Sequence, residues 1–263
     1  MIKIFSLFIF IMSCNIIQAQ DITKVYTVPA ARQGVAVDTD HFYVINNSTI
    51  TKHDKKNGQL VASWEDKDSV LNHMNSGIII EGKLYCINSS YPELPMASSL
   101  EVFDPETLTH IDNHSFGILN GSATWIDKYN DFWYVAFAHY SGKGGVENKT
   151  NAWTELVKFD PLWRQTESWI FPKKLLEKFG NNSTSGGVIL PDGKILCTGH
   201  DNFEIYLLEF PTKGFTLNWI DTFPVGSYGQ GIALEKSGGS ELIYGIIRNE
   251  NKVVVTSLKK LSN

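Results

Sequence analysis

The chain has few cysteines, no cluster of basic residues and no long apolar run beyond its first residues. Three cysteines in 263 residues are too few for the dense disulfide framework of a small extracellular scaffold. The net charge is -5, and no basic stripe is present to neutralise phosphates, so a nucleic-acid partner is excluded. No segment after the leader is long and apolar enough to span a bilayer. We therefore expect one globular domain without a transmembrane segment.

Common catalytic signatures are absent as well. The sequence contains no HExxH, no P-loop, no nucleotide-binding glycine motif and no serine elbow. Glycoside hydrolysis needs a pair of carboxylates at the site. Asp201 is the carboxylate expected near the centre of the fold, while Glu93, Glu147 and Glu250 are expected farther out in loops.

The first residues have the pattern of a secretory signal. Lys3 precedes the apolar stretch 4–12, and Ala19 is suited to cleavage. We predict a signal peptide over residues 1–19, one domain over 20–263, and a periplasmic or secreted protein. The alternative uses 11–14 as an imperfect lipobox, which would leave a lipoprotein anchored through Cys14.

A segment made of a small residue, an apolar run, a turn and a second apolar run recurs five times along the chain. Its spacings are 43, 46, 64 and 44 residues, which is a propeller period with one insertion. The insertion contains a Gly- and Asn-rich loop over 141–151 and a helical stretch over 173–179. The sequence therefore predicts a five-bladed β-propeller, an all-β fold, with repeats that begin at Gly34, Gly77, Ala123, Gly187 and Gly231.

The last repeat contains three strands instead of four, because the chain ends soon after 252–258. The β-rich segment 22–28 precedes the first repeat and has no blade of its own. We predict that it pairs with 252–258 and closes the ring, which removes an open sheet edge. The alternative β-sandwich would not require the period or the orphan strand.

Two cysteines, Cys86 and Cys197, occupy matching positions of non-neighbouring repeats. Their Cα atoms are therefore expected to lie beyond the reach of a disulfide, which is about 7 Å. We predict two buried free thiols.

In a propeller, the connections from strand 4 to strand 1 and from strand 2 to strand 3 share one face. Three histidines on these connections, His73, His139 and His200, are the candidate catalytic acid or base, because imidazole titrates near neutral pH. They are also the candidate ligands if the cofactor is a divalent metal ion. Arg32 and Arg248 could clamp a carboxylate. The candidate substrate-binding residues are Arg32, Gln33, Asn75, Tyr91, Tyr140, Asp201, Tyr228, Gln230 and Arg248.

The remaining polar residues receive structural interpretations. His53 replaces a phenylalanine of its repeat, and His41, His110 and His114 lie in turns or outer strands. The acidic residues of the turns after the innermost strands are expected on the opposite face, in contact with solvent; they are Asp38, Glu81, Asp127, Asp192 and Glu235.

Nearly the whole mature chain, from Arg32 to Val255, resembles bacterial propeller proteins often labelled "cycloisomerase". The label implies lyase or isomerase chemistry on a small acid, and it brings no defined catalytic motif. The segments that carry the resemblance are 31–34, 50–58, 72–77, 91–95, 137–145, 197–201 and 229–231.

Two functions fit these residues. The first is an enzyme that acts on a small anionic or sugar-derived substrate by histidine-mediated proton transfer, as a lyase, an isomerase or a lactone-opening enzyme. The second is a non-catalytic module that binds a glycan or peptide with the same rim. The candidate residues differ from blade to blade, which favours one central site. We expect a monomer whose partner is a small molecule or carbohydrate.

Overall fold

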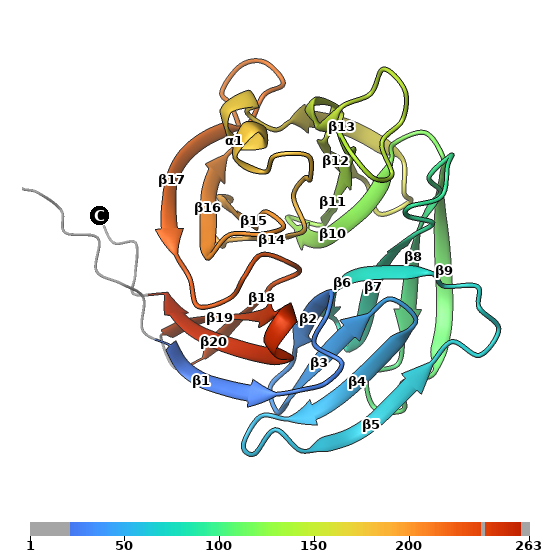
Figure 1. Cartoon of the computed structure of the whole chain (residues 1–263), viewed down its shortest axis with the longest axis vertical. Coiled ribbons are helices and arrows are strands. Elements are labelled where there is room, and N and C mark those ends of the chain that lie inside the picture. The colour runs from blue at the N-terminus through green and yellow to red at the C-terminus, as the bar shows by residue number, and fades with distance from the viewer. Residues whose placement is uncertain (1–21, 238–239, 259–263) are drawn as a thin grey trace, which may run out of the picture.

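The computed structural model describes residues 22–237 and 240–258. The strands of this part form five antiparallel sheets of four strands each around a central axis (Figure 1). This is the predicted five-bladed propeller. Blade 1 comprises β2 (Gly34–Val37), β3 (His41–Asn46), β4 (Thr49–Asp54) and β5 (Leu60–Glu65); blade 2 β6 (His73–Ile80), β7 (Lys83–Ser89), β8 (Ser98–Phe103) and β9 (His110–Gly117); blade 3 β10 (Ser122–Tyr129), β11 (Phe132–Ala138), β12 (Glu155–Phe159) and β13 (Gln165–Ile170); blade 4 β14 (Gly186–Ile189), β15 (Ile195–Thr198), β16 (Glu204–Glu209) and β17 (Asn218–Pro224); blade 5 β18 (Ala233–Ser237), β19 (Ser240–Ile247), β20 (Lys252–Leu258) and β1 (Ile22–Thr27).

The ring closes in blade 5, where the first strand of the chain completes the last sheet. β1 pairs antiparallel with β20, and Val25 lies opposite Val254. This confirms the predicted closure. β1 thereby covers the edge of β20, which would otherwise be unpaired.

The core is divided into five apolar clusters, each between two neighbouring blades. The cluster between blades 3 and 4, for example, packs Trp125 and Leu156 against Ile189 and Tyr206. Burying one such side chain stabilises the fold by about 1.5–3 kcal/mol. Side chains on each face of a sheet therefore pack against the neighbouring blade, and these contacts hold the blades together.

Close to the axis, small residues let the innermost strands approach one another. A Cβ atom added to Gly34 of blade 1 would lie 2.4 Å from the carbonyl oxygen of Asn75 in blade 2. Across the closure, Gly231 N donates to Gln33 O at 2.8 Å. The repeat-initial glycines are therefore there for close packing, and they narrow the channel at this level.

Two boundaries of the innermost strands differ from the expected ones. β18 begins at Ala233, after the expected repeat start at Gly231, because Gly229 and Gln230 both have positive φ angles, 61° and 68°. β6 begins earlier than expected, at His73, and tolerates a register irregularity between Met74 and Ser76. Backbone irregularities of this kind leave no periodicity signal in the sequence.

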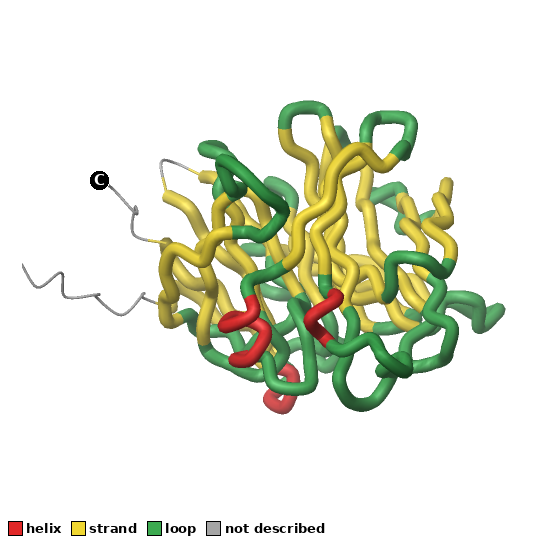
Figure 2. The backbone as a smooth tube through the Cα atoms, turned by 90° about the horizontal axis from the view of Figure 1, so that it is seen from above, coloured by secondary structure: helices red, strands yellow, loops and turns green. Residues whose placement is uncertain are grey.

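The helical turns gather on one face. They are η1 (Asn151–Trp153), α1 (Lys173–Lys178) and η2 (Arg248–Glu250), and they lie together with the long connections at one end of the strands (Figure 2). α1 follows Pro172, as predicted from the inserted helical stretch. Within the described ranges, no helix is long and apolar enough to cross a membrane.

The two described cysteines are buried and unpaired, as predicted. Burial raises the pKa of both the Cys86 and the Cys197 thiol well above its usual range, so neither is a reactive thiolate at neutral pH. The predicted signal peptide, its cleavage after Ala19 and the alternative lipid anchor at Cys14 lie outside the described residues and remain predictions.

Candidate functional site

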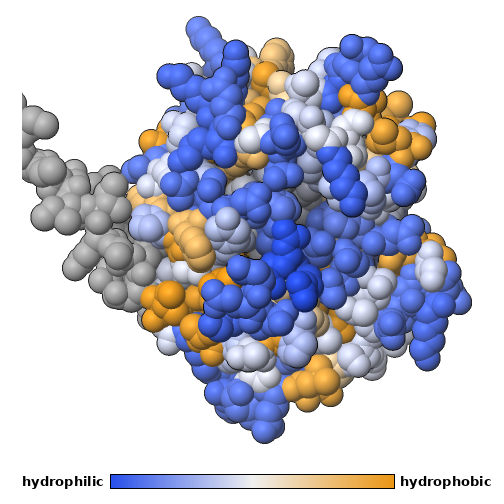
Figure 3. All heavy atoms as spheres, in the orientation of Figure 1, coloured by the Kyte–Doolittle hydropathy of each residue, from blue (hydrophilic) through white to orange (hydrophobic). Residues whose placement is uncertain are grey.

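A group of polar and aromatic side chains meets where the connections of all five blades converge on the axis. We call it the mouth cluster. Its members come from the 2–3 connections of blades 1 to 5 and from the start of β6: Asn47, His73, Tyr91, Tyr140, His200 and Arg248. The centre of this face is hydrophilic (Figure 3).

His73 is held in one orientation by blade 1. Its Nδ1 lies 3.0 Å from Asn47 Oδ1, and the same oxygen accepts a hydrogen bond from Gln33 Nε2 at 3.0 Å. Because the amide oxygen can only accept, Nδ1 of His73 must carry the hydrogen, and Nε2 therefore carries the lone pair. The arrangement prepares Nε2 to accept a proton.

The surroundings keep this ring neutral. Burial lowers the pKa of His73 to about 4, and the nearby positive charges of Arg248 and Lys143 act in the same direction. A histidine with this pKa is uncharged at neutral pH, so it is available as a base and not as an acid.

The titration of His73 can be measured without a substrate. We expect its imidazole signals in a two-dimensional NMR titration to show an inflection near pH 4, against an unperturbed value of about 6.5. Since the pKa in the folded state lies below that in the unfolded chain, His73 contributes stability above about pH 6.5 that is lost as the pH falls towards 4. Asn47→Asp should raise the inflection, because a carboxylate beside Nδ1 favours imidazolium. An inflection near 6.5 in the wild type would contradict the desolvation of the half-buried His73 ring.

Blades 4 and 5 contribute a second pair. Arg248 Nη2 lies 3.0 Å from His200 Nε2, and the guanidinium can only donate, so Nε2 accepts. On the other side of the ring, Nδ1 of His200 lies 2.6 Å from Asp201 Oδ1 but makes no well-directed hydrogen bond. The hydrogen bond with His200 thereby holds Arg248 at the mouth. In the described part of the chain, Arg248 forms no ion pair with a carboxylate, so its charge can serve an anionic ligand.

Aromatic rings form the opposite wall of the cluster. The ring of Tyr91 lies 4.9 Å from that of His73 and 4.9 Å from that of Tyr140, measured between centroids. Gly144 of the long blade 3 loop packs on Tyr91 so closely that an added Cβ would be 2.5 Å from the ring. Burial raises the pKa of Tyr140 to about 12, against the opposing effect of its hydrogen bond with Ser122. Tyr140 therefore keeps its hydroxyl hydrogen at neutral pH and can donate it in a hydrogen bond.

Four other candidates support the cluster or lie beside it. Asn75 is buried and donates from Nδ2 to Ala123 O at 3.1 Å, which ties blade 2 to blade 3. Gln230 is buried and donates from Nε2 to the carbonyl oxygen of His200 at 3.1 Å. Gln33 supports Asn47, and Tyr228 packs on Phe203 with their ring centroids 4.7 Å apart.

His139 and Arg32 do not join the mouth cluster, contrary to the expected convergence. His139 is buried, its Nε2 lies 3.1 Å from Asn120 O, and it lines a separate cavity with Leu119 and Lys149. Its ring is turned towards the connection between β9 and β10, where Gly121 leaves room for it. Arg32 is exposed, and no contact found for the described residues links it to Arg248.

The geometry does not fit the three-histidine metal site. His73 and His200 contact different partners, Asn47 and Arg248, and no three metal-ligating side chains gather anywhere in residues 22–237 or 240–258. The ring nitrogens of His200 also face Arg248 and Asp201, a cation and a carboxylate, in place of an open ligand position.

The sequence interpretation missed two residues of this region, Asn47 and Lys143. Asn47 follows β3 directly and has a positive φ of 46°, and the Asn46–Asn47 pair was a turn signal that could have pointed to it. Lys143 lies in the inserted loop and is exposed. The loop reaches the mouth, since Gly144 packs on Tyr91 and the charge of Lys143 lowers the pKa of His73.

Comparisons with known proteins support the propeller fold but assign the chain to no family. No protein-family model and no curated protein matches the chain. Among solved structures, it is similar to a GH43 β-xylosidase/α-arabinofuranosidase from a compost microbial metagenome, with 12% identity and a TM-score of 0.58 over 93% of this chain and 95% of that one. A luciferin-regenerating enzyme has 10% identity and a TM-score of 0.55, over 89% and 92% of the two chains. A gluconolactonase from Xanthomonas campestris has 13% identity and a TM-score of 0.52, over 87% and 72%.

At these identities the likeness concerns the fold alone. The three structures are enzymes that share the propeller architecture with this chain. None of the three bears the label "cycloisomerase", and that resemblance remains a prediction.

Proposed function

We propose that the chain is an enzyme that acts on a small anionic or sugar-derived substrate by proton transfer, with His73 as the base. The observation that carries the proposal is the pairing of a neutral imidazole, whose Nδ1 hydrogen is fixed on Asn47, with Arg248 nearby. The propeller enzymes of similar fold include a gluconolactonase and a GH43 glycosidase, which supports a substrate of this class. The contacts of the mouth cluster include one carboxylate, Asp201, whereas glycoside hydrolysis uses two. On the leader sequence alone, we place the activity outside the cytoplasm.

In this proposal each residue has a distinct role. Arg248 binds the substrate anion through its guanidinium, and His200 holds Arg248 in place. Nε2 of His73 accepts a proton from the substrate carbon or from an attacking water. Tyr140 keeps its hydrogen at neutral pH and donates to the oxyanion that forms. The imidazolium then returns the proton to the leaving oxygen or to the neighbouring carbon.

The reaction type can be separated by three assays on the purified protein. Opening of glucono-1,5-lactone is followed by base uptake in a pH-stat, elimination from galactarate by ultraviolet absorbance, and isomerisation of glucuronate by NMR. Turnover in one assay identifies the reaction. Activity in none of the three, with binding retained, would favour the alternative below.

Arg248 should select for negative charge. We expect the wild type to bind glucuronate more tightly than glucose in calorimetry, and Arg248→Gln to weaken glucuronate binding about tenfold or more, since a hydrogen bond to a charged group is lost. Glucose binding should change little. The matched control is Arg164→Gln, because Arg164 is exposed and pairs with Asp160 away from the mouth. Equal losses for both sugars would show that Arg248 does not read the carboxylate.

One observation favours the second function, a non-catalytic glycan-binding module. The adjacent rings of His73, Tyr91 and Tyr140 form an aromatic surface of the kind on which sugar rings can pack. In that case Tyr91→Ala would weaken binding more than Arg248→Gln, and no assay would detect turnover.

A further inference from the structure

The cavity that His139 lines lies between blades 2 and 3, and we call it the side cavity. Three connections form it: the one between β7 and β8, the one between β9 and β10, and the one between β11 and β12. Its volume is about 320 Å³, within the range of small-molecule pockets. The apolar residues that line it are Leu94, Pro95, Met96, Ile118, Leu119 and Val146.

Much of this apolar lining is in contact with solvent. Leu119 is 81% exposed, and Ile118 and Leu94 are 54% and 51% exposed, whereas Met96 is buried. Single exposed apolar residues are common on soluble proteins, but apolar residues gathered around one hollow are typical of a binding site. A ligand with an apolar body would remove this surface from water.

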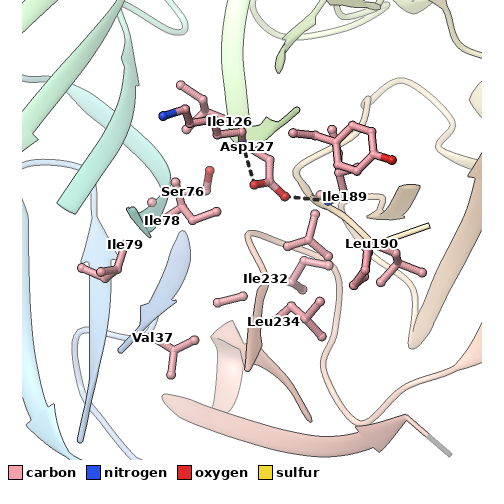
Figure 4. A pocket seen from close by; sticks show the side chains of 17 residues that line it. Val37, Ser76, Ile78, Ile79, Ile126, Asp127, Ile189, Leu190, Ile232 and Leu234 are labelled. Carbon is pink, nitrogen blue, oxygen red and sulfur yellow. Dashed lines mark hydrogen bonds between the residues drawn. The ribbon is translucent and has the colours of Figure 1, made fainter. Parts of the chain in front are cut away.

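The cavity at the other end of the channel is of a different kind (Figure 4). Asp127, which lines it, was expected in solvent on a turn, but β10 continues past it to Tyr129 and Asp127 is only 7% exposed. Its Oδ2 accepts a hydrogen bond from Ile189 N at 2.6 Å, and its Oδ1 accepts one from Lys128 N at 2.7 Å. The protein itself therefore engages this carboxylate, which ties blade 3 to blade 4.

The side cavity has a cation in its lining, Lys149. The ammonium nitrogen lies 5.2 Å from the centroid of the Trp153 ring, and in the described chain it makes no hydrogen bond or ion pair. Burial lowers the pKa of His139, and the charge of Lys149 acts in the same direction, so the His139 ring is neutral and close to the ammonium. Burial raises the pKa of Glu155 against the effect of Lys149, but the two groups form no ion pair. The three N–H donors of Lys149 are therefore available to an anion.

We propose that the side cavity binds a small carboxylic acid, with its aliphatic chain against the apolar wall and its carboxylate paired with Lys149. The wall favours the chain because burial removes both apolar surfaces from water. The ammonium favours the carboxylate because a hydrogen bond between two charged groups is stronger than one between neutral groups. The side cavity and the mouth cluster have no residue in common, so the site does not depend on the function proposed for the mouth.

Two methyl groups of the wall can report binding. In protein labelled at the methionine and isoleucine methyl groups, we expect hexanoate to shift the NMR signals of Met96 and Ile118 saturably, while those of Ile111 and Ile220 stay constant. Hexanol, which has the same chain without the charge, should bind about tenfold more weakly, and acetate, which lacks the chain, should cause no saturable shift. Equal affinities for hexanoate and hexanol, or no saturable shift with hexanoate, would overturn the proposal.

The same signals distinguish other occupants of the side cavity. Shifts that depend on protein concentration without any probe would indicate a second copy of the chain. Shifts with phosphatidylglycerol vesicles but not with hexanoate would indicate a lipid surface. Either result would overturn the proposal.

Two variants separate the charge from the wall. Lys149→Gln should weaken hexanoate about tenfold and leave hexanol unchanged, whereas Lys174→Gln, at an exposed position of α1, should affect neither. Leu119→Ser should weaken both probes about threefold, and Leu162→Ser, at another exposed leucine, should not. Both cavity residues are at least partly exposed, so the variants are expected to fold. Unchanged hexanoate affinity in Lys149→Gln would overturn the pairing with Lys149.

Discussion

His73→Asn is expected to lower kcat/KM by about 10²–10⁴, the usual contribution of a positioned base. The side-chain amide of the substituted residue can still donate to Asn47 Oδ1, as Nδ1 of the imidazole does, but it has no counterpart of the basic Nε2 atom. The loss should therefore fall on kcat, with KM for the substrate identified in the three assays little changed. Steady-state kinetics of the wild type and the variant measure it.

The pH profile tests the same residue independently. Because the base must be neutral, kcat/KM should fall as the pH drops through about 4, the pKa of His73, and be independent of this group above it. The matched control for the His73→Asn kinetics is His114→Asn. His114 lies on β9, the outer strand of the same blade as His73, and stacks on Trp163 away from the mouth. If both variants keep full activity, His73 is not the base.

Gly34→Ala is expected to destabilise the protein by about 3 kcal/mol, the upper part of the usual range for overpacking. The new Cβ atom would lie 2.4 Å from Asn75 O and 2.8 Å from Ser76 Cα. Both are backbone atoms of blade 2, so no side chain can turn away to make room. Urea unfolding followed by tryptophan fluorescence measures the change in the free energy of unfolding.

The control for this prediction is another glycine with space around it. A Cβ on Gly142 would lie 3.4 Å from Asn181 Cβ, an ordinary contact, and Gly142 has no positive φ angle. Gly142→Ala should therefore change stability by less than about 0.5 kcal/mol. Equal unfolding midpoints for Gly34→Ala and the wild type would contradict the prediction, because they would show that blades 1 and 2 can move apart to admit the methyl group without loss of stability.

The sequence was sufficient to predict the ring but not the details of its two ends. The period of the small residues and the orphan segment 22–28 predicted five blades and their closure, because both follow from repetition. The connection rule also put His73, His200 and Arg248 on one face. The hydrogen bond between Arg248 and His200 fits this placement, and a site shared by all three residues remains a prediction.

The failures have a common physical origin. Which face a connection lies on does not determine the direction of its side chains, so His139 was expected at the axis but turns towards Asn120. Asp127 was assigned to a turn because the turn residues that follow, Asn130 and Asp131, have no strand periodicity that marks where β10 ends. Side-chain direction at strand ends depends on local φ and ψ angles, which a pattern of residue types does not fix.

The pairing of β1 with β20 also has a consequence for the order of folding. Val25 is among the first residues of the described chain to be synthesised, and its partner Val254 is among the last. Contacts of such sequence separation form slowly, because a very long loop must close first. Blades 1 to 4 can each form from consecutive strands, but the ring cannot be completed until β20 has been synthesised. Until then β1 stays unpaired, and its strand edge is the part of the young chain most exposed to pairing with another molecule.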